Sequence, residues 1–312
     1  MAITLQEAKV GMADKVDQQI IDTFRRSSLL LDALTFDNAI SPGTGGSTLT
    51  YGYIQLKSPS TAAVRTINTE YTPNEAKREE KTAKAEIMGG SFEVDRVLQN
   101  TSGAVDELAF QAEQKIKATA NEFHNRAINS ESGLKATLAG TENEFTSEVD
   151  LSTSDLMDEN YSAFLDELDT LIASVDGTPS MLLVNGDMLT KIRSTARRAG
   201  YYTRSEDAFG QPVENYNNIP IVNVGNYYDG SKSVGIIPTG ADGTTEIYAV
   251  SIGLDGFHGI SPVGNNVIQG YMPDMTAPGA VKKGEVELVA GVVLKNTLKA
   301  AVLKGIKVKP TA

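Results

Sequence analysis

Cysteine is absent from this chain of 312 residues, and the only histidines are His124 and His258. Without cysteine there are no disulfide bonds and no thiolate metal ligands. No pair of histidines stands at a metal-binding spacing. No apolar run approaches the roughly 20 residues that a membrane-spanning helix needs, and the N-terminus lacks the basic start and apolar stretch of a secretion signal. These absences indicate a folded, soluble protein made inside the cell.

Catalytic motifs are missing as well. The glycine-rich segment at 43–46 lacks the Gly-Lys-Ser/Thr ending of a phosphate-binding loop, and no Gly-x-Ser-x-Gly nucleophile motif occurs. A cluster of carboxylates falls opposite the apolar stripe of a predicted helix, which is typical of a solvated helix face. The cluster consists of Asp155, Asp158, Glu159, Asp166, Glu167 and Asp169. We therefore predict no enzyme activity, no cofactor and no metal site.

The net charge of −12 is unevenly distributed. Residues 281–312 hold seven lysines against two glutamates, whereas residues 131–170 hold eleven carboxylates against Lys135 alone. A dedicated nucleic-acid-binding protein would show a basic face, so this pattern argues against one. It remains compatible with the wall of a container.

Residues 41–96 form the most distinctive segment. After a turn of small residues, alternation places Leu49, Tyr51 and Tyr53 on one face of a strand. The return strand carries four acidic and four basic residues at positions 75–86 and has little apolar face. An isolated two-stranded ribbon is only marginally stable in water. We predict an extended β-hairpin that lies on a second copy of the chain; a ribbon inside a larger sheet of the same domain is the alternative.

A second candidate contact is a basic group on a predicted helix, which is either a solvated helix end or a contact between subunits. The group consists of Lys191, Arg193, Arg197, Arg198 and Arg204. The residues that we predict to contact a neighbouring copy are Tyr51, Tyr53, Lys57, Arg65, Arg78, Glu79, Glu80, Lys81, Lys84, Arg197 and Arg198.

Hydrophobic periodicity predicts the remaining elements. An amphipathic N-terminal helix carries Val16, Ile20 and Phe24, and a long helix spans 103–129. A second strong helix follows Ser154-Asp155 and stops at Gly177. A helix capped by Asp187 runs to about residue 198. Strands are predicted at 91–98, 181–184, 219–224 and 246–252, with two strand-like runs between 285 and 309.

In this order the parts resemble a major capsid protein of tailed bacteriophages with the Hong Kong 97-type fold. The resemblance is carried by Gly46 to Tyr53, Val184 to Ile192, Asn218 to Val222, and Gly291 to Ile306. It implies an α+β fold with an N-terminal arm (1–40), an extended loop (41–84, its return strand running to about 96) and two domains. The peripheral domain would take 85–150 and 275–312, with the spine helix at 103–129, and the axial domain 151–274.

The resemblance also implies a function without catalytic residues. Pentamers and hexamers of the chain would tile an icosahedral shell, part of a virion assembled in the bacterial cytoplasm, around double-stranded DNA that the acidic wall repels. The expected partners are a separate scaffolding protein, a portal and decoration proteins, and no contact with a membrane is expected. The scaffolding protein is expected to be separate because only about forty residues precede the hairpin. Some relatives crosslink a loop lysine to an asparagine; Lys57 and Asn296 are candidates, but we expect no crosslink.

Three other interpretations remain open. An encapsulin-type nanocompartment shell shares the fold but encloses a cargo enzyme. A carboxylate-dependent α+β enzyme would need acids converging in a pocket. A tail-tube subunit is disfavoured by the long helix and the α/β middle region.

Overall fold

A computed structural model of the chain describes residues 30, 33–40, 49–58, 60–101, 107–152, 158–199, 203–206, 212–262, 268–274 and 276–310. The helix predicted around Val16, Ile20 and Phe24 lies outside these residues. Within them, no helix is long and apolar enough to cross a membrane.

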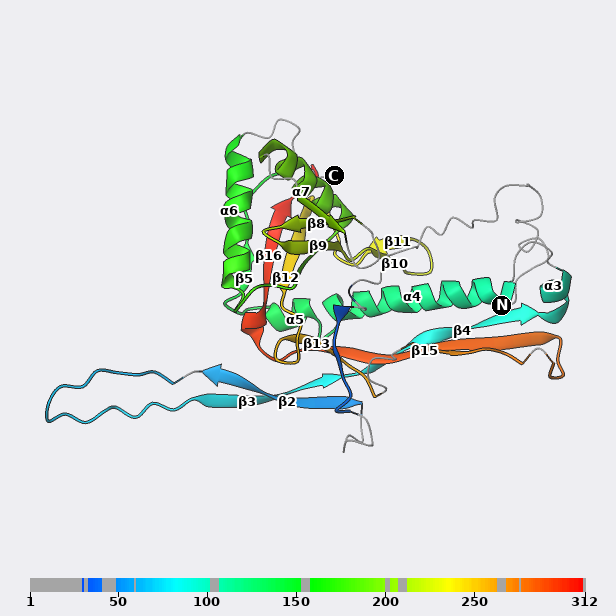
Figure 1. Cartoon of the computed structure of the whole chain (residues 1–312), viewed down its shortest axis with the longest axis horizontal. Coiled ribbons are helices and arrows are strands. Elements are labelled where there is room, and N and C mark those ends of the chain that lie inside the picture. The colour runs from blue at the N-terminus through cyan, green and yellow to red at the C-terminus, as the bar shows by residue number, and fades with distance from the viewer. Residues whose placement is uncertain are drawn as a thin grey trace.

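The first layer is a long sheet beneath a long helix (Figure 1). Its strands follow the order β1 (Phe36–Asp37), β13 (Phe257–Ile260), β15 (Val281–Leu294) and β14 (Ile268–Tyr271), and β4 (Glu86–Asp95) also pairs with β15. Helix α4 (Glu107–Asn129) lies along β4 and β15. Alternation along β15 buries every second residue from Val286 to Val292 on the helix side. Phe123 and Ala127 meet them from the predicted helical stripe.

The second layer is a seven-stranded sheet. Its order is β5 (Glu144–Thr146), β16 (Ala300–Lys307), β12 (Thr244–Val250), β6 (Met181–Val184), β9 (Ile219–Asn223), β8 (Pro212–Tyr216) and β7 (Thr203–Glu206). Helices α6 (Asp158–Ser174) and α7 (Gly186–Ala199) pack against the face that carries Leu182 and Val184. The predicted stripe of α6 is confirmed, because Phe164, Leu168 and Leu171 are fully buried.

The other face of the second sheet joins the two layers. Leu183, Tyr248 and Val250 pack in one cluster with Phe123 of α4 and Leu288 of β15. Short elements of the described part are α5 (Leu134–Leu138), the hairpin of β10 (Asn226–Tyr228) and β11 (Ser233–Gly235), and the 3-10 turn Thr297–Lys299. A continuous core therefore fixes the orientation of the long sheet relative to the second sheet.

Two local predictions are corrected. The strand expected to run to Leu98 ends at Asp95, whose carboxylate accepts a hydrogen bond from the backbone N–H of Val97 and starts the helix α3 (Arg96–Thr101). Helix α7 is capped by Asn185 and not by Asp187, because Asn185 Oδ1 accepts from the Met188 N–H at 2.8 Å. The Asn185 amide also donates to the Ile237 carbonyl, Thr239 and Thr245, which explains why it is buried.

The two sheets divide the chain differently from the predicted domains. Strands β15 and β16 follow each other in sequence, yet β15 lies in the long sheet and β16 in the seven-stranded sheet. Conversely, β13 and β14 fall inside the predicted axial range of 151–274 but pair with β15. Strand β16, which the prediction assigns to the peripheral piece 275–312, pairs with β12 and β5 of the seven-stranded sheet.

Candidate intersubunit surface

A two-stranded ribbon projects from the body of the molecule (Figure 1). It consists of β2 (Thr50–Ser58) and β3 (Lys77–Lys84), antiparallel and, among the described strands, paired only with each other. Residues 60–76 connect them without helix or strand. At its inner end β3 leads through the single residue Ala85 into β4 of the long sheet. The predicted hairpin thus exists, and its return strand continues into the body.

The base of the ribbon is docked on the chain itself. Tyr51 and Tyr53 stack with ring centroids 6.2 Å apart and form a buried cluster with Ala83, Ile260 and Val293. Only 8% of Tyr51 and 9% of Tyr53 is exposed. The prediction that the hairpin lies on a second copy and not on its own chain is therefore wrong at this end. A contact of Tyr51 and Tyr53 with a neighbouring copy stays a prediction. The alternating face was correct, but its partner is the edge of the chain's own sheet.

Polar contacts reinforce the docked base. The Tyr51 hydroxyl donates to Asp37 Oδ2 at 3.0 Å, and Gln55 Nε2 donates to the Lys295 carbonyl at 3.1 Å. Lys295 Nζ lies 5.3 Å from the Tyr51 ring centroid, within the range of a cation–π contact. His258 meets the same ring edge-on at 6.0 Å. Tyr51 is therefore held in place by strand β1, strand β13 and the loop after β15.

Beyond its base the ribbon is exposed on both faces. Every residue of β3 except Ala83 is exposed, which includes the predicted contact residues Arg78, Glu79, Glu80, Lys81 and Lys84. On β2, Ile54 lies opposite Glu80 and is 67% exposed. Alternation places Arg78, Glu80 and Lys84 on one face of β3, so each face presents charges of both signs.

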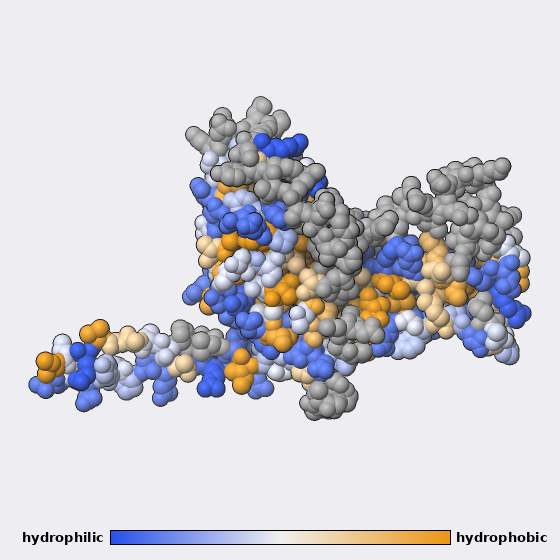
Figure 2. Space-filling view, in the orientation of Figure 1, coloured by the Kyte–Doolittle hydropathy of each residue, from blue (hydrophilic) through white to orange (hydrophobic). Residues whose placement is uncertain are grey.

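The tip of the ribbon adds apolar residues that the sequence reasoning missed. Val64, Ile67 and Tyr71 are 101%, 89% and 59% exposed, and Figure 2 shows hydrophobic residues at the far end of this thin extension. Arg65, a predicted contact residue, lies over the Tyr71 ring with its guanidinium carbon 5.5 Å from the centroid. A reverse turn at Thr66 to Thr69 closes the tip. Their spacing of three and four is typical of a helix face, yet residues 60–76 form neither helix nor strand, so periodicity does not predict their exposure.

The basic group of α7 is divided by the structure. Arg193 forms an ion pair with Glu214, 2.5 Å between Nε and Oε1, and therefore serves the fold of its own chain. Arg197 is exposed and donates from Nε to the Arg193 carbonyl at 3.3 Å. The side chain of Arg198 lies outside the described part. Of the two predicted contact residues here, Arg197 is placed on the surface.

The two candidate crosslinking residues lie in different parts of the chain. Lys57 lies in β2, but its side chain is outside the described residues. The Asn296 side chain caps the 3-10 turn, accepting from the Leu298 N–H at 3.0 Å. Asn296 therefore has a structural role within its own chain.

The acidic and basic segments of the sequence meet each other along β16. Lys304 pairs with Glu144, and Lys307 pairs with Asp150 at 3.3 Å. The hydrogen bond from Lys304 holds the pKa of Glu144 below its usual value. Two carboxylates of the acidic block at 131–170 are thus paired with lysines of the same chain. Asp166 and Asp169 of α6 are exposed, as expected for a solvated helix face.

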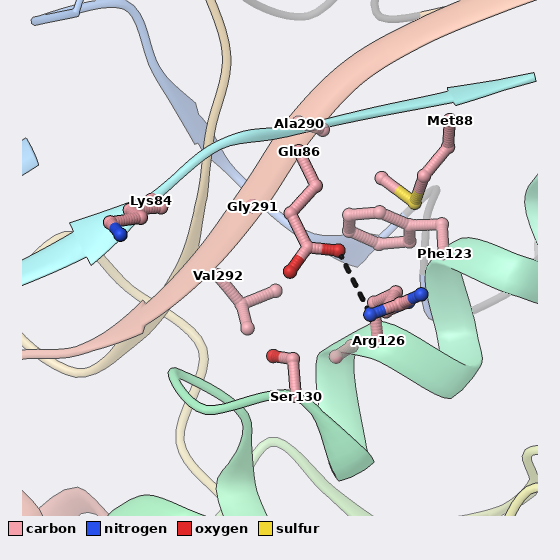
Figure 3. A pocket seen from close by; sticks show the side chains of 10 residues that line it. Lys84, Glu86, Met88, Phe123, Arg126, Ser130, Ala290, Gly291 and Val292 are labelled. Carbon is pink, nitrogen blue, oxygen red and sulfur yellow. Dashed lines mark ion pairs between the residues drawn. The ribbon is translucent and has the colours of Figure 1, made fainter. Parts of the chain in front are cut away.

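One hollow lies between β4, β15 and α4, where Glu86 Oε2 faces Arg126 Nη1 at 3.3 Å beside Met88 and Phe123 (Figure 3). It encloses about 10 Å³, room for at most one water molecule. No group of three or more His, Asp or Glu side chains in the described residues is arranged to hold a metal. Both histidines are buried, His124 at 1% exposure and His258 at 0%.

Known structures resemble the chain over its whole length, although no family model and no curated protein matches its sequence. An encapsulin complex from Synechococcus elongatus PCC 7942 aligns with a TM-score of 0.67 and 15% identity, covering 99% of this chain and 97% of the other. A structure from Mycobacterium phage Bobi gives 0.60 and 12%, covering 97% and 98%. The capsid of Myoviridae phage XM1 gives 0.54 and 13%, covering 94% and 97%.

These likenesses show the fold. The chain has the α+β Hong Kong 97-type fold, as predicted from the order of its parts. The matched structures include an encapsulin, the capsid of a phage and the capsid of a GTA particle.

Proposed function

We propose that this chain is the major capsid protein of a tailed bacteriophage, a subunit that assembles into a closed icosahedral shell around double-stranded DNA. Pentamers and hexamers of the chain form the shell, with a separate scaffolding protein, a portal and decoration proteins as partners. The subunit itself carries out no catalysis. It belongs to the virion after assembly in the host cytoplasm.

The observation that carries this proposal is the outer half of the ribbon. It exposes Ile54, Val64, Ile67 and Tyr71, large apolar side chains that are stabilised only when another surface covers them. An isolated two-stranded ribbon is at best marginally stable in water. Contact with a second copy removes the apolar tip from water, and the mixed charges of β3 then select one register of that contact.

Assembly through the ribbon also follows from symmetry. The ribbon of one copy and the surface that receives it on the next copy are different patches, so the contact is heterologous. Heterologous contacts close into rings when the rotation between copies is a whole fraction of a turn. Rings of five and six copies are the units from which an icosahedral shell is built.

An exchange of two charges tests the proposal. Arg78 and Glu80 lie on the same face of β3, so the double variant Arg78→Glu/Glu80→Arg keeps the composition and the net charge and changes only their order. We expect the variant to keep the circular dichroism spectrum and melting temperature of the wild type but to lose closed shells in negative-stain electron microscopy. A wild-type chain that stays monomeric under every condition would overturn the proposal.

A second variant addresses the apolar tip. Ile67→Asp places a charge on a side chain that must be buried in the contact, and Ile67→Leu is its matched control because it keeps the apolar area. We expect sedimentation velocity to show shells for Ile67→Leu and small species for Ile67→Asp. Equal assembly of both variants would show that the tip takes no part in the contact between subunits.

A second candidate function is the shell of an encapsulin-type nanocompartment. It is favoured by the encapsulin complex, which has a higher TM-score than the phage structures reported above. The two functions differ in what the shell encloses. Nuclease-protected double-stranded DNA inside particles purified from the native source supports the phage capsid, and a co-purifying cargo enzyme without DNA supports the nanocompartment.

A further inference from the structure

The base of the ribbon covers a histidine. His258 and Ile260 alternate along β13 and share the face on which Tyr51 and Tyr53 pack, together with Val293 of β15. Phe257, in contrast, lies on the opposite face among the residues beneath α4. His258 is 0% exposed, and Tyr51 lies edge-on to its imidazole at 6.0 Å. Lifting the ribbon from the sheet therefore opens the imidazole to water.

The surroundings of the buried His258 imidazole do not stabilise a positive charge on it. Nδ1 lies 3.3 Å from the Gly256 carbonyl, while Nε2 is buried without a hydrogen-bond partner in the described structure. A proton on both nitrogens would need a second acceptor, and a buried charge without one is costly. Burial, with the nearby charge of Lys295, lowers the pKa of His258 below its usual 6.5.

The charged groups around the histidine do not supply that acceptor. Asp37 of β1 is engaged by the Tyr51 hydroxyl, and Lys295, after β15, holds its ammonium over the Tyr51 ring. Asp255 belongs to the exposed turn before β13 and is salt-linked to Lys299 at 3.9 Å. Protonation would therefore add a second cation next to Lys295 and compete with Tyr51 for Asp37.

We propose that His258 is a pH-sensitive latch for the ribbon, whose protonation favours a state in which the ribbon base lifts from β13 and β15. That this opening also changes contacts between subunits rests on the function proposed above; the opening itself is a property of the single chain.

The direction follows from linkage. A group that binds its proton more tightly in the open state shifts the equilibrium toward that state as the pH falls. We take the imidazole of the open state to have the ordinary pKa of about 6.5. The equilibrium constant for opening is then at most about 30-fold larger at pH 5 than at pH 7.5, and this limit holds when the docked state takes up no proton. The opening equilibrium should therefore increase several-fold, and no more than about 30-fold.

Hydrogen exchange on the full-length, unassembled chain tests the latch. Amides of 49–54 and 83–85 should lose protection, after correction for intrinsic exchange rates, between pH 7.5 and pH 5. His258→Gln and His258→Phe should abolish this loss, and two replacements of different shape guard against misfolding of one. His124→Leu is the matched control, since His124 is the only other histidine and lies on α4 away from the ribbon cluster.

The outcomes separate the two proposals. Loss of protection in the wild type and in His124→Leu, but not in the His258 variants, supports the latch. Constant protection in the wild type, or an equal loss in the His258 variants, overturns it even if closed shells form. Failure to form shells with an intact pH response would overturn the proposed function and leave the latch standing.

Discussion

His124 makes the stability of the subunit depend on pH in a way that can be calculated. Its imidazole lies on the buried side of α4 at 1% exposure, and in the described structure neither ring nitrogen has a hydrogen-bond partner. Burial lowers the pKa of His124 from 6.5 to about 4. The folded chain therefore releases this proton far more readily than the unfolded chain. Acid should destabilise the fold through this one side chain.

The sign and the size follow from the two pKa values. Above pH 6.5 the imidazole is neutral in both states and causes no pH dependence. As the pH falls through 6.5 the unfolded state is protonated first, so the free energy of unfolding decreases until the pH passes below about 4. The loss amounts to about 2 kcal/mol at pH 5 and about 3 kcal/mol at the acid limit.

The variant His124→Leu isolates this effect. Leucine has a similar volume, favours a helix and does not titrate. Urea unfolding followed by circular dichroism at pH 7.5, 6 and 5 gives the free energy of unfolding for both proteins. The difference between variant and wild type should grow in favour of the variant by about 2 kcal/mol from pH 7.5 to pH 5. Carboxylates and His258 are common to both proteins, so their contributions cancel.

A constant difference across this pH range would refute the reasoning. It would mean that the imidazole is as easily protonated in the folded chain as in the unfolded chain. At neutral pH the variant should be at least as stable as the wild type, because it removes a buried polar group that lacks a partner.

Two further predictions concern the fold. Gly284→Ala should destabilise the chain by about 1–3 kcal/mol in thermal unfolding, because the new Cβ would lie 2.4 Å from the Phe92 ring across the strand pair. Gly270→Ala is the control. Its Cβ meets only a side chain, at 3.7 Å, so its effect should be much smaller. Asn185→Ala should lower the free energy of unfolding in urea by about 2–3 kcal/mol, since it removes the helix cap and leaves buried partners without donors. An unchanged urea midpoint would show that these contacts are not stabilising.

The sequence predicts well wherever one period lasts for several turns. The spacing of Phe164, Leu168 and Leu171 predicted α6 and its buried side, and alternation at Tyr51 and Tyr53 predicted one face of β2. Both patterns record that a side chain is buried, but neither records what it is buried against. The alternation therefore does not show that the tyrosines pack on β13 and β15 of the same chain.

Strand partners are likewise not encoded by periodicity. The two C-terminal strands resemble a hairpin in sequence, yet the 3-10 turn at Thr297–Lys299 directs β16 into the other sheet. The exposed tip carries Val64 and Ile67 at a helix-like spacing in a segment that is neither helix nor strand, so only their exposure indicates that they are available for a contact. The charged strand β3 was recognised because its composition alone makes burial costly.

The uninterrupted path from β3 through Ala85 into β4 determines how the molecule bears force. A pull on the ribbon acts along β4, which is paired in register with β15 over ten consecutive residues from Glu86 to Asp95, with hydrogen bonds at alternate pairs. Force along the strands loads these bonds together, in shear, whereas force across them would open the pairs one after another. If the ribbon tip is held by a neighbouring copy in a shell, as proposed above, outward pressure from the contents of the shell would load the β4–β15 pair in shear, the direction in which a strand pair is strongest.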